Sequence, residues 1–285
     1  MQLSVIIPAR NVATTLREQL DALAAQDWDG EWEVVVVDNG SIDETVQIAN
    51  EYARRDPRVR VVEALDGSGV SYVRNRGIEL AQGEAIAICD GDDIVGPRWV
   101  AAMGDALLAH EVVTGPMDVD SLNPPWLVAT RGGFPADGPR EYLGLFPLVP
   151  GGNIGIQRAT WDRIGRYDED FSGPEDADFS LRLWVGNVPV HFAPDAVLSY
   201  RYRREIGALF RQGRFYGRGR PLVSKRIRAT GRARPPRFSG WKSWVALIVS
   251  LPGIVTFDGR ARWCWIAGNR LGNLEGSIKH RSLYL

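Results

Sequence analysis

The sequence predicts an α/β protein whose mainly parallel sheet is flanked by helices, as in a Rossmann-like fold. Over the first hundred residues, short apolar runs alternate with segments whose apolar residues recur at helical spacing. The run VVVV at residues 34–37 is typical of a strand that is buried on both faces. Strands that alternate with helices in this way favour a parallel sheet with helices on both sides.

The elements of this first region follow one another closely. A strand is expected at Leu3–Ile7, where Pro8 ends it, and a helix is expected at Val12–Ala25. In open α/β sheets, ligands bind beyond the carboxyl ends of the strands, so the polar residues that follow each strand are candidates for one crevice. The later elements are expected at Glu33–Val37 (strand), Thr45–Arg54 (helix), Val59–Val62 (strand), Val70–Ala81 (helix) and Ala85–Cys89 (strand).

The pattern changes after about residue 110. Residues 115–152 are rich in Pro and Gly, which predicts a long loop region and not a second core. Such loops are either functional or disordered, and acceptor binding is one hypothesis for this region. Within residues 151–184 we expect a short strand, a helix and a second helix that begins near Glu175. Two short strands are expected near residues 190–192 and 197–200.

Residues 201–285 form a basic extension. They contain 19 Lys and Arg against 3 Asp and Glu, whereas residues 1–200 contain 15 against 32. Arg203–Arg220 is expected to form a basic helix, residues 231–240 a linker, and residues 241–255 an amphipathic or a buried apolar segment. This charge separation predicts that the extension packs on the acidic body or faces an anionic partner, such as phosphate groups or a membrane surface.

Composition restricts the class of protein. The chain has 285 residues, of which 45% are hydrophobic and 24% charged, so it can bury a sizeable core. Its two cysteines, Cys89 and Cys264, match no zinc or redox spacing, and we expect a reducing, cytoplasmic setting. No signal-peptide pattern and no run of about 18 apolar residues occurs, which disfavours secretion and membrane spanning.

The segment AICDGDDIV, residues 87–95, places three carboxylates directly behind an expected buried strand. Asp90 and Asp92, one residue apart, can reach a single hard cation such as Mg²⁺, which takes its other ligands from phosphates and water. Gly91 lets the backbone turn sharply and approach a ligand. The alternative is an acidic turn in which an Asp, for instance Asp93, caps the next helix. The segment alone does not separate the two.

Two other acidic segments also suit either a functional role or a purely local structural one. Asp38 follows the VVVV strand, where a carboxylate suits either a ribose hydroxyl or the local turn. Glu175, Asp176 and Asp178 crowd the first turn of an expected helix; the helix dipole favours one or two of them, and a further carboxylate suits a general base. Neither G-x-G-x-x-G after the first strand nor a P-loop motif occurs, so neither kind of phosphate recognition is expected.

Five blocks of the sequence, in order and with their spacing, resemble glycosyltransferase family 2, whose members are nucleotide-sugar-dependent enzymes of the GT-A fold. The resemblance spans residues 3 to about 200, and it is specific because all five blocks agree. The blocks are SVIIPARNVATTLREQLDAL, EVVVVDNGSIDET, VSYVRNRGIELAQGEAIAICDGDDIV, GGNIGIQRATWDRIGRYDEDF and PEDADFSLRLW.

The resemblance implies which residues bind the donor. The backbone at Pro8 and Ala9 and the carboxylate of Asp38 would contact the nucleoside, and Arg74 would lie near the base or the diphosphate. UDP-sugars are favoured as donors over GDP- and dTDP-sugars.

The resemblance also implies a metal site. Asp90 and Asp92 match the family's D-x-D, which holds Mn²⁺ or Mg²⁺ against the diphosphate, and Gly91 lies between them. Asp93 would support the same site. The metal would stabilise the departing diphosphate as a Lewis acid.

The implied reaction is a single displacement with inversion at the anomeric carbon. Asp176 would be the base that deprotonates a hydroxyl acceptor, aided by Glu175. One sugar is transferred per event, to a glycan, a lipid-linked glycan or a small molecule. Weaker candidates for the site are Asn153, Asp178, Arg204 and Arg211.

These expectations divide the chain into two domains. Residues 1–200 form the GT-A catalytic domain, with a nucleotide-binding half at 1–110 and an acceptor-binding half at 111–200. Residues 201–285 form the helical basic extension, whose aromatic residues suit peripheral contact with the inner face of the plasma membrane or packing on the catalytic domain. No nucleic acid is expected as a partner.

The sequence departs from the family at two points. Asn39 stands where relatives usually have a second acidic residue, which leaves the nucleotide preference open. No His lies near Tyr200, where many relatives have one beside the metal or diphosphate, so the arginines of 201–220 are expected to neutralise the diphosphate. Two other functions remain as alternatives, a sugar-nucleotide nucleotidyltransferase of similar fold and a non-catalytic module that binds anions or nucleic acid.

Overall fold

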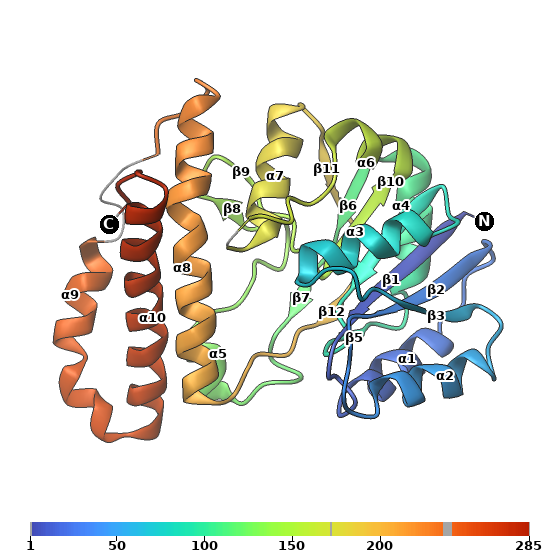
Figure 1. Cartoon of the computed structure of the whole chain (residues 1–285), viewed down its shortest axis with the longest axis horizontal. Helices are drawn as coiled ribbons and strands as arrows, with labels where there is room; N and C mark the ends of the chain where they lie inside the picture. The colour runs from blue at the N-terminus through green and yellow to red at the C-terminus, as the bar shows by residue number, and fades with distance from the viewer. Residues whose placement is uncertain (1, 172, 236–240, 285) are drawn as a thin grey trace.

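A computed structural model describes residues 2–171, 173–235 and 241–284. Its main element is a seven-stranded sheet, at the right of Figure 1. The strands lie in the order β11 (Val190–Phe192), β6 (Val112–Thr114), β10 (Asn153–Gln157), β4 (Ala85–Cys89), β1 (Leu3–Ala9), β2 (Trp32–Asp38) and β3 (Val59–Glu63).

The strand order creates a binding crevice. β10 is antiparallel to β4 and β6, and the other neighbouring pairs are parallel, which confirms the mainly parallel sheet. The chain runs outward from β1 to β3 and then returns to β4 on the other side of β1. The carboxyl ends of β1 and β4 therefore flank a topological switch point, where α/β proteins bind ligands.

Two boundaries in this region differ from those expected. Pro8 does not end the first strand: β1 pairs with β2 through Ala9, whereas it pairs with β4 only through Ile6. Pro8 thus lies beyond the pairing with β4, where its missing amide donor costs no hydrogen bond to that strand. The first helix begins at Leu16 and not at Val12, because residues 12–15 form a turn.

Helices cover both faces of the sheet, as the alternating pattern predicts. One face packs against α1 (Leu16–Ala24), α2 (Thr45–Ala53) and α4 (Trp99–Ala109), and the other packs against α3 (Val70–Leu80), α6 (Arg158–Ile164) and α7 (Glu175–Val185). In β2, Val34 and Val36 face the first core and Val35 and Val37 the second. The VVVV run is therefore buried on both faces, which is why it does not alternate with polar residues.

The Pro- and Gly-rich region has only short elements. β5 (Ile94–Val95), β12 (Leu198–Ser199) and β7 (Met117–Asp118) form a small sheet beside the main one. A short helix, α5 (Pro125–Arg131), and a hairpin of β8 (Glu141–Tyr142) and β9 (Phe146–Pro147) follow. The long loop region expected at 115–152 thus contains a helix and a hairpin, both too short to form a core of their own.

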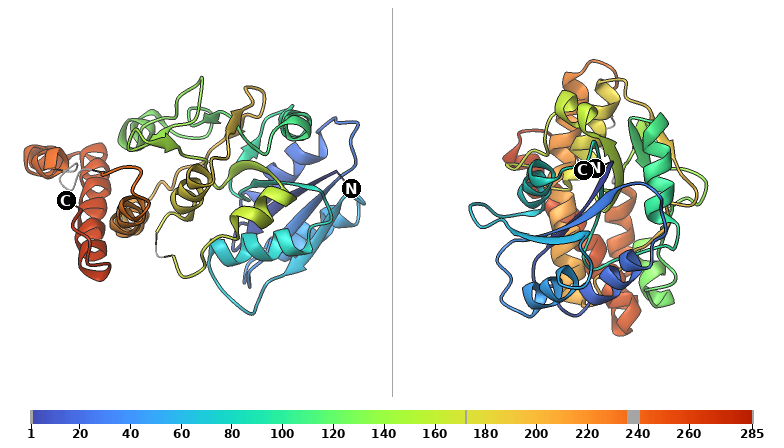
Figure 2. Two further views of the ribbon diagram at one scale, coloured as in Figure 1. Left: turned by 90° about the horizontal axis from the view of Figure 1, so that it is seen from above. Right: turned by 90° about the vertical axis from the view of Figure 1, so that its right-hand side faces the viewer.

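The C-terminal extension is helical. It consists of α8 (Ile206–Ala229), α9 (Trp241–Val249), the 3₁₀ turn η1 (Leu251–Val255) and α10 (Phe257–Lys279), and α8 and α10 lie side by side at the left of Figure 1. Figure 2 shows α8 between α10 and the α/β part of the chain that contains the seven-stranded sheet. The expected basic helix is confirmed, and it continues nine residues past Arg220. Part of the expected linker, residues 236–240, lies outside the described residues.

Glycines let α8 and α10 approach closely. A Cβ atom added at Gly217 of α8 would collide with the carbonyl oxygen of Asn269, and one added at Gly272 of α10 would collide with that of Arg214. Gly213, Gly268 and Gly276 are equally tight against the opposing backbone. The two helices therefore pack backbone against backbone.

The α9 helix lies on the outside of the molecule. None of its residues is buried, so of the two expectations for 241–255, an amphipathic or a buried apolar segment, the buried one is wrong. In the part of the chain that the structure describes, no helix is both long and apolar enough to cross a membrane.

Candidate active site

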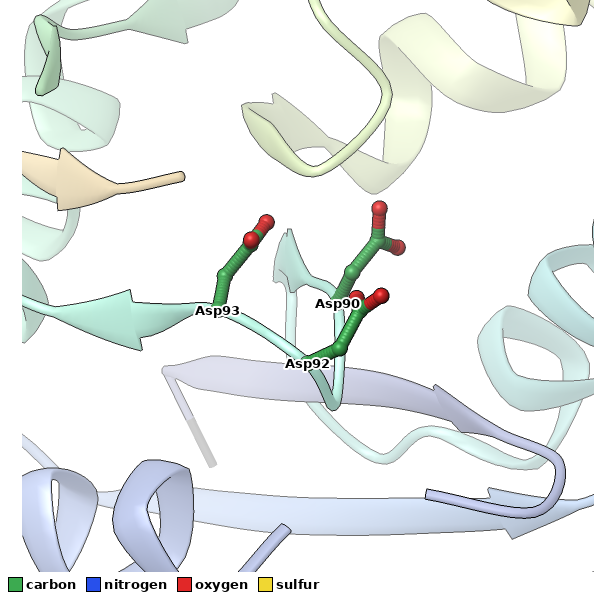
Figure 3. A group of neighbouring side chains, drawn as sticks. All are labelled: Asp90, Asp92 and Asp93. Carbon is green, nitrogen blue, oxygen red and sulfur yellow. The ribbon is translucent and has the colours of Figure 1, made fainter. Parts of the chain in front are cut away.

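The three aspartates that follow β4 converge at the switch point. Each of Asp90, Asp92 and Asp93 offers one carboxylate oxygen, and these oxygens lie within 4.8 Å of one another. Figure 3 shows all three side chains pointing to the same side of the loop, with Asp90 and Asp92 closest together. Oxygen ligands at this spacing can share one hard cation.

The electrostatics of the cluster fit a bound cation. Burial first, and the neighbouring Asp90 carboxylate second, raise the pKa of Asp92 to about 6. Burial and the charges of Asp92 and Asp90 raise the pKa of Asp93 well above its usual range. The Oδ2 atom of Asp93 is buried and accepts no hydrogen bond from the described residues. A divalent ion would relieve both the repulsion and this unmet hydrogen-bonding requirement.

Arg201 ties the aspartate loop to the strand β12. Its backbone amide donates to Oδ1 of Asp93 over 2.8 Å, and its Nε donates to the carbonyl oxygen of Asp92 over 2.9 Å. One oxygen of Asp93 is thus used to position the loop, and the other remains available. Asp93 is therefore both a support of the site and a candidate ligand.

Arg74 joins the aspartate loop to α7. Its side chain is only 3% exposed, and its guanidinium pairs with Asp90 Oδ1 at 2.9 Å and with Glu175. The close pair Gly151 and Gly152 makes room for this bridge: a Cβ at Gly152 would lie 2.7 Å from Asp90 Oδ2, and one at Gly151 would overlap the Arg74 guanidinium. Larger residues at 151 and 152 would push the bridge apart.

Asp176 lies in the first turn of α7 beside this bridge. Burial, and then the charge of Glu175, raise the pKa of Asp176 to about 7. The backbone amide of Ala177 donates to its Oδ1 over 2.7 Å. A carboxylate with a pKa near neutral pH is a suitable general base, because it is partly ionised and still binds a proton well.

Two cavities meet at these residues. The first has a volume of about 580 Å³ and opens beyond β1 and β4. Of the candidate residues, those that line it are Pro8, Ala9, Arg74, Asp90, Gly91, Asp92, Glu175 and Arg211. Its size is within the range of small-molecule sites. Asn39, Arg201 and Arg203 also face it.

The second cavity has a volume of about 250 Å³ and contains Asp176. The loop region of 115–152 and the helices α8 and α10 supply most of its other walls. Both cavities are lined by Arg74, Asp90, Glu175, Tyr200 and Tyr216. The carboxylates that could hold a metal ion and the candidate base therefore lie on two sides of one junction.

Two candidates at the strand ends have local partners instead. The carboxylate of Asp38 accepts hydrogen bonds from the backbone amides of Gly40 and Ser41, as in the turn interpretation, while Asn39 is the neighbour that lines the first cavity. Asn153 is fully buried in β10, where its Oδ1 accepts from the indole of Trp99 over 2.8 Å. Neither Asp38 nor Asn153 lines either cavity.

Two charged candidates also point elsewhere. Asp178 is buried on the far side of α7, where it pairs with Arg182 and Arg226. Arg204 donates to the carbonyl oxygen of Leu122 over 3.0 Å and lines neither cavity. Of the three acidic residues in the first turn of α7, Glu175 and Asp176 therefore face the site.

The structure adds residues that the sequence did not single out. Tyr200 lines both cavities. Gln212, Tyr216 and Arg220 lie four residues apart on one face of α8 and face the cavities. The four-residue spacing is visible in the sequence, but nothing in it shows that this face of α8 meets the site.

The match of residues 4–163 to the model of Glycosyl transferase family 2 decides the family. The chain belongs to glycosyltransferase family 2. Residues 85–272 also match the model of Glycosyl transferase family group 2, which extends over α8 and most of α10. The resemblance of the five sequence blocks is therefore confirmed.

The family relatives include several bacterial proteins. The PGL/p-HBAD biosynthesis glycosyltransferase of Mycobacterium bovis is 40% identical over 185 residues, which are 64% of this chain and 69% of the relative. The uncharacterized glycosyltransferase YibD of Escherichia coli is 34% identical over 166 residues, 57% of this chain. The chain spans 46% of YibD and 26% of the uncharacterized EpsJ of Bacillus subtilis, so it matches about half or less of these proteins.

Solved structures share the fold. The mannosyltransferase PcManGT from Pyrobaculum calidifontis, in complex with GDP-Man and Mn²⁺, has a TM-score of 0.67 at 18% identity and covers 98% of this chain and 87% of its own. S. aureus TarS 1-349 in complex with UDP-GlcNAc has a TM-score of 0.56 at 21% identity and covers 100% and 93%. These neighbours confirm the GT-A fold of this chain.

Proposed function

We propose that this protein is a metal-dependent, inverting glycosyltransferase that moves one sugar from a nucleoside-diphosphate sugar to an acceptor hydroxyl. The observation that supports this most directly is the junction of the two cavities. On one side lie the carboxylates that suit a cation, and this cation would in turn bind a diphosphate. On the other side lies Asp176, a buried carboxylate whose pKa is raised to about 7. A displacement needs these two functions on opposite sides of one carbon atom.

The first cavity would hold the donor. The backbone at Pro8 and Ala9 would contact the nucleoside, and the guanidinium groups of Arg201, Arg203 and Arg211 would lie toward the diphosphate. UDP-sugars are the favoured donors. The complexes of the structural neighbours with UDP-GlcNAc and with GDP-Man support a nucleotide sugar.

The residues present fit a divalent ion. Asp90 and Asp92 would hold Mn²⁺ or Mg²⁺, with the free oxygen of Asp93 within reach. When bound, the ion would supply Lewis-acid stabilisation of the negative charge on the departing diphosphate. Arg74 would hold Asp90 and Glu175 in position through the rest of the reaction.

Asp176 would act on the acceptor in the second cavity. Its carboxylate would accept the proton of the acceptor hydroxyl while that oxygen forms a bond to the anomeric carbon. The bond between this carbon and the diphosphate oxygen breaks at the same time, so the configuration inverts. Glu175, held by Arg74, would orient the acceptor beside the base.

The two alternative functions have less support. A nucleotidyltransferase of this fold is expected to have a Gly-rich loop after the first strand, and residues 8–15 contain no glycine. A nucleic-acid binder needs a free basic surface. Several arginines of the extension are instead paired with acidic residues, as Arg214 and Arg218 are with Glu275.

We also propose that the exposed apolar surface of the extension contacts a membrane. Ile248 and Val249 of α9 and Val255 of η1 are at least 70% exposed, and Lys242 and Arg260 lie in the same segment. Apolar side chains flanked by cations suit the interface of an anionic bilayer. The acceptor would then be reached from the membrane surface.

Binding of nucleotides tests the donor proposal. Thermal unfolding is measured with UDP, GDP, dTDP and their sugars, each with and without Mn²⁺. A matching ligand raises the midpoint of unfolding because it binds only the native state. We expect the largest rise for a UDP-sugar with Mn²⁺, followed by release of UDP when an acceptor is added. Formation of pyrophosphate from a nucleoside triphosphate and a sugar phosphate would instead establish the nucleotidyltransferase.

A further inference from the structure

The second cavity contains an unusual surplus of positive charge. Four guanidinium groups line it, but Arg74 is committed to Asp90 and Glu175. Among the described residues, the other three arginines, Arg131, Arg140 and Arg220, form no ion pair with a carboxylate. The carboxylates of Asp90, Glu175 and Asp176 line the same cavity, and Arg74 is paired with the first two, so the other three guanidinium groups can attract a further anion.

Arg220 is the clearest of the three. It lies in α8, one turn beyond Tyr216, and within the described part of the chain its side chain has no hydrogen bond, ion pair or aromatic partner. Its charge acts on the phenol of Tyr142 across the cavity, and so does the charge of Asp176. Arg220, Tyr142 and the candidate base Asp176 line the same cavity of about 250 Å³, so one ligand can reach both charged groups.

The other two arginines are held in place by aromatic rings. The guanidinium of Arg131 lies 4.0 Å from the ring centroid of Trp265 and 4.5 Å from that of Tyr202. The guanidinium of Arg140 lies 4.8 Å from the ring centroid of Phe134. Cation–π contacts fix the position of a guanidinium without neutralising its charge. Arg131 also donates from Nη1 to Gln212, and Arg140 donates from Nη2 to the carbonyl oxygen of Gly133. The other N–H groups stay available for an anion.

We propose that this arginine group binds a phosphate carried by the acceptor. The acceptor is then a phosphate-bearing alcohol, whose phosphate lies against Arg220, Arg140 and Arg131 and whose hydroxyl reaches Asp176. This inference rests on the proposed function. One guanidinium group can donate hydrogen bonds to two oxygens of a phosphate at once. Three guanidinium groups therefore match a doubly charged phosphate better than they match a single carboxylate.

The surroundings of Arg220 agree with this assignment. Burial, and then the charge of Arg220, lower the pKa of Arg270 on α10 to about 10. The positive charge therefore extends behind the cavity wall. The aromatic side chains of Tyr142, Phe134 and Trp265 complete the lining and suit the apolar or sugar part of such an acceptor.

Calorimetric titration tests the phosphate site. The protein is first saturated with UDP and Mn²⁺, which fill the donor cavity, and phenyl phosphate is then added. We expect the wild type to bind phenyl phosphate. In Arg220→Gln and in Arg140→Gln the affinity should be at least about tenfold lower, because each change removes a charge-assisted contact. Benzyl alcohol, which has no phosphate, should bind equally to all three proteins.

Arg211→Gln provides the matched control on the same helix. Arg211 lines only the donor cavity, so this change should weaken UDP and leave phenyl phosphate unaffected. Unchanged phenyl phosphate affinity in both Arg220→Gln and Arg140→Gln, with unfolding midpoints equal to wild type, would overturn the phosphate site. If inorganic phosphate binds as tightly as phenyl phosphate, the assignment of this phosphate site to an acceptor would be overturned. Failure of the wild type to bind any nucleotide with Mn²⁺ would instead refute the proposed function.

The source of the phosphate is distinguished by two further assays. Co-sedimentation with phosphatidylcholine vesicles that contain phosphatidylinositol, a lipid with both a phosphate and hydroxyl groups, would identify a lipid phosphate if it is lost in Arg220→Gln. Release of UDP stimulated by a water-soluble sugar phosphate, and lost in the same variant, would identify a soluble one. Either result supports a phosphate-bearing acceptor.

Discussion

At the scale of single residues, the site concentrates carboxylates whose charges repel one another. Asp92, Asp93 and Asp176 all have raised pKa values because burial and neighbouring carboxylates disfavour the charged form. Arg74 compensates only Asp90 and Glu175 directly. Such arrangements reduce stability and are typical of functional sites.

Asp92→Asn tests the metal site. In the wild type, Mn²⁺ should raise the unfolding midpoint that is measured with UDP, and we expect the variant to lose this rise. Each kcal/mol of binding free energy that is lost lowers the midpoint by roughly 2–4 °C. The mutation removes one of two principal ligands without changing the size of the side chain. Asp162→Asn, on an exposed position of α6, is the matched control and should keep the full rise. A rise of wild-type size in Asp92→Asn would show that the ion binds elsewhere.

Asp176→Asn tests the base. The variant should bind UDP and Mn²⁺ normally but transfer sugar at least about 100-fold more slowly, since a positioned base contributes that much. In the wild type, the rate should rise with pH through about 7 and then level, because only the ionised carboxylate accepts a proton. A pH profile without this rise, or full activity in the variant, would exclude Asp176 as the base.

The same group affects stability with a defined sign. The folded state holds the Asp176 proton more tightly than the unfolded chain, so the free energy of unfolding falls as pH increases toward about 7 and remains lower above it. Asp176→Asn removes this effect and should unfold at no lower temperature than the wild type at pH 8. Asp178→Asn breaks a buried ion pair in the same helix turn and should unfold at a lower temperature.

At the scale of secondary structure, the strands and helices of the first half follow directly from hydrophobic period. The strand at Ala85–Cys89 has the expected boundaries, and the helices at 45–53 and 70–80 each end one residue before the expected position. Short elements such as α5 and the β8–β9 hairpin could not be predicted, because two to seven residues in a Pro- and Gly-rich stretch show no period.

The glycine-mediated packing of α8 on α10 is a further feature of this scale. Gly272→Ala should destabilise the protein by about 1–3 kcal/mol, because its Cβ would press on the backbone of α8. Donor binding should also weaken, since α8 lines both cavities. Gly253→Ala in the 3₁₀ turn η1, where a Cβ meets no atom within 4 Å, is the control. Equal unfolding midpoints for the two variants would show that α8 and α10 are not closely packed.

At the scale of the whole molecule, the extension completes the site. Through Gln212, Tyr216 and Arg220, α8 supplies walls to both cavities, while α10 supports it from behind and contributes Trp265. The acidic body and the basic extension therefore meet at the candidate site, which is one of the two outcomes that their charges predict. The outer surface of the extension, with α9, remains free for the proposed membrane contact.

A double substitution tests the membrane contact. Ile248→Asp with Val255→Asp places two charges on side chains that are 70% and 80% exposed. We expect at least about tenfold weaker co-sedimentation with vesicles containing an anionic phospholipid, since each apolar side chain loses its burial in the interface. Leu108→Asp on α4, 73% exposed, is the matched control and should bind vesicles as the wild type does. Weak vesicle binding by the wild type itself would refute the contact.

The sequence alone determined the family, the parallel sheet and the positions of Asp90, Asp92, Glu175 and Asp176. The hydrophobic period and the short acidic motifs involve residues that are close together in the sequence, so they can be recognised without the structure. Only the tertiary structure decided that Arg74 bridges two of these acids, that Asp178 faces Arg226 instead of the site, and that α8 closes both cavities. These facts depend on which faces of distant elements meet. Contacts between residues as far apart in the sequence as Asp178 and Arg226, or Arg74 and Glu175, leave no periodic pattern in the chain.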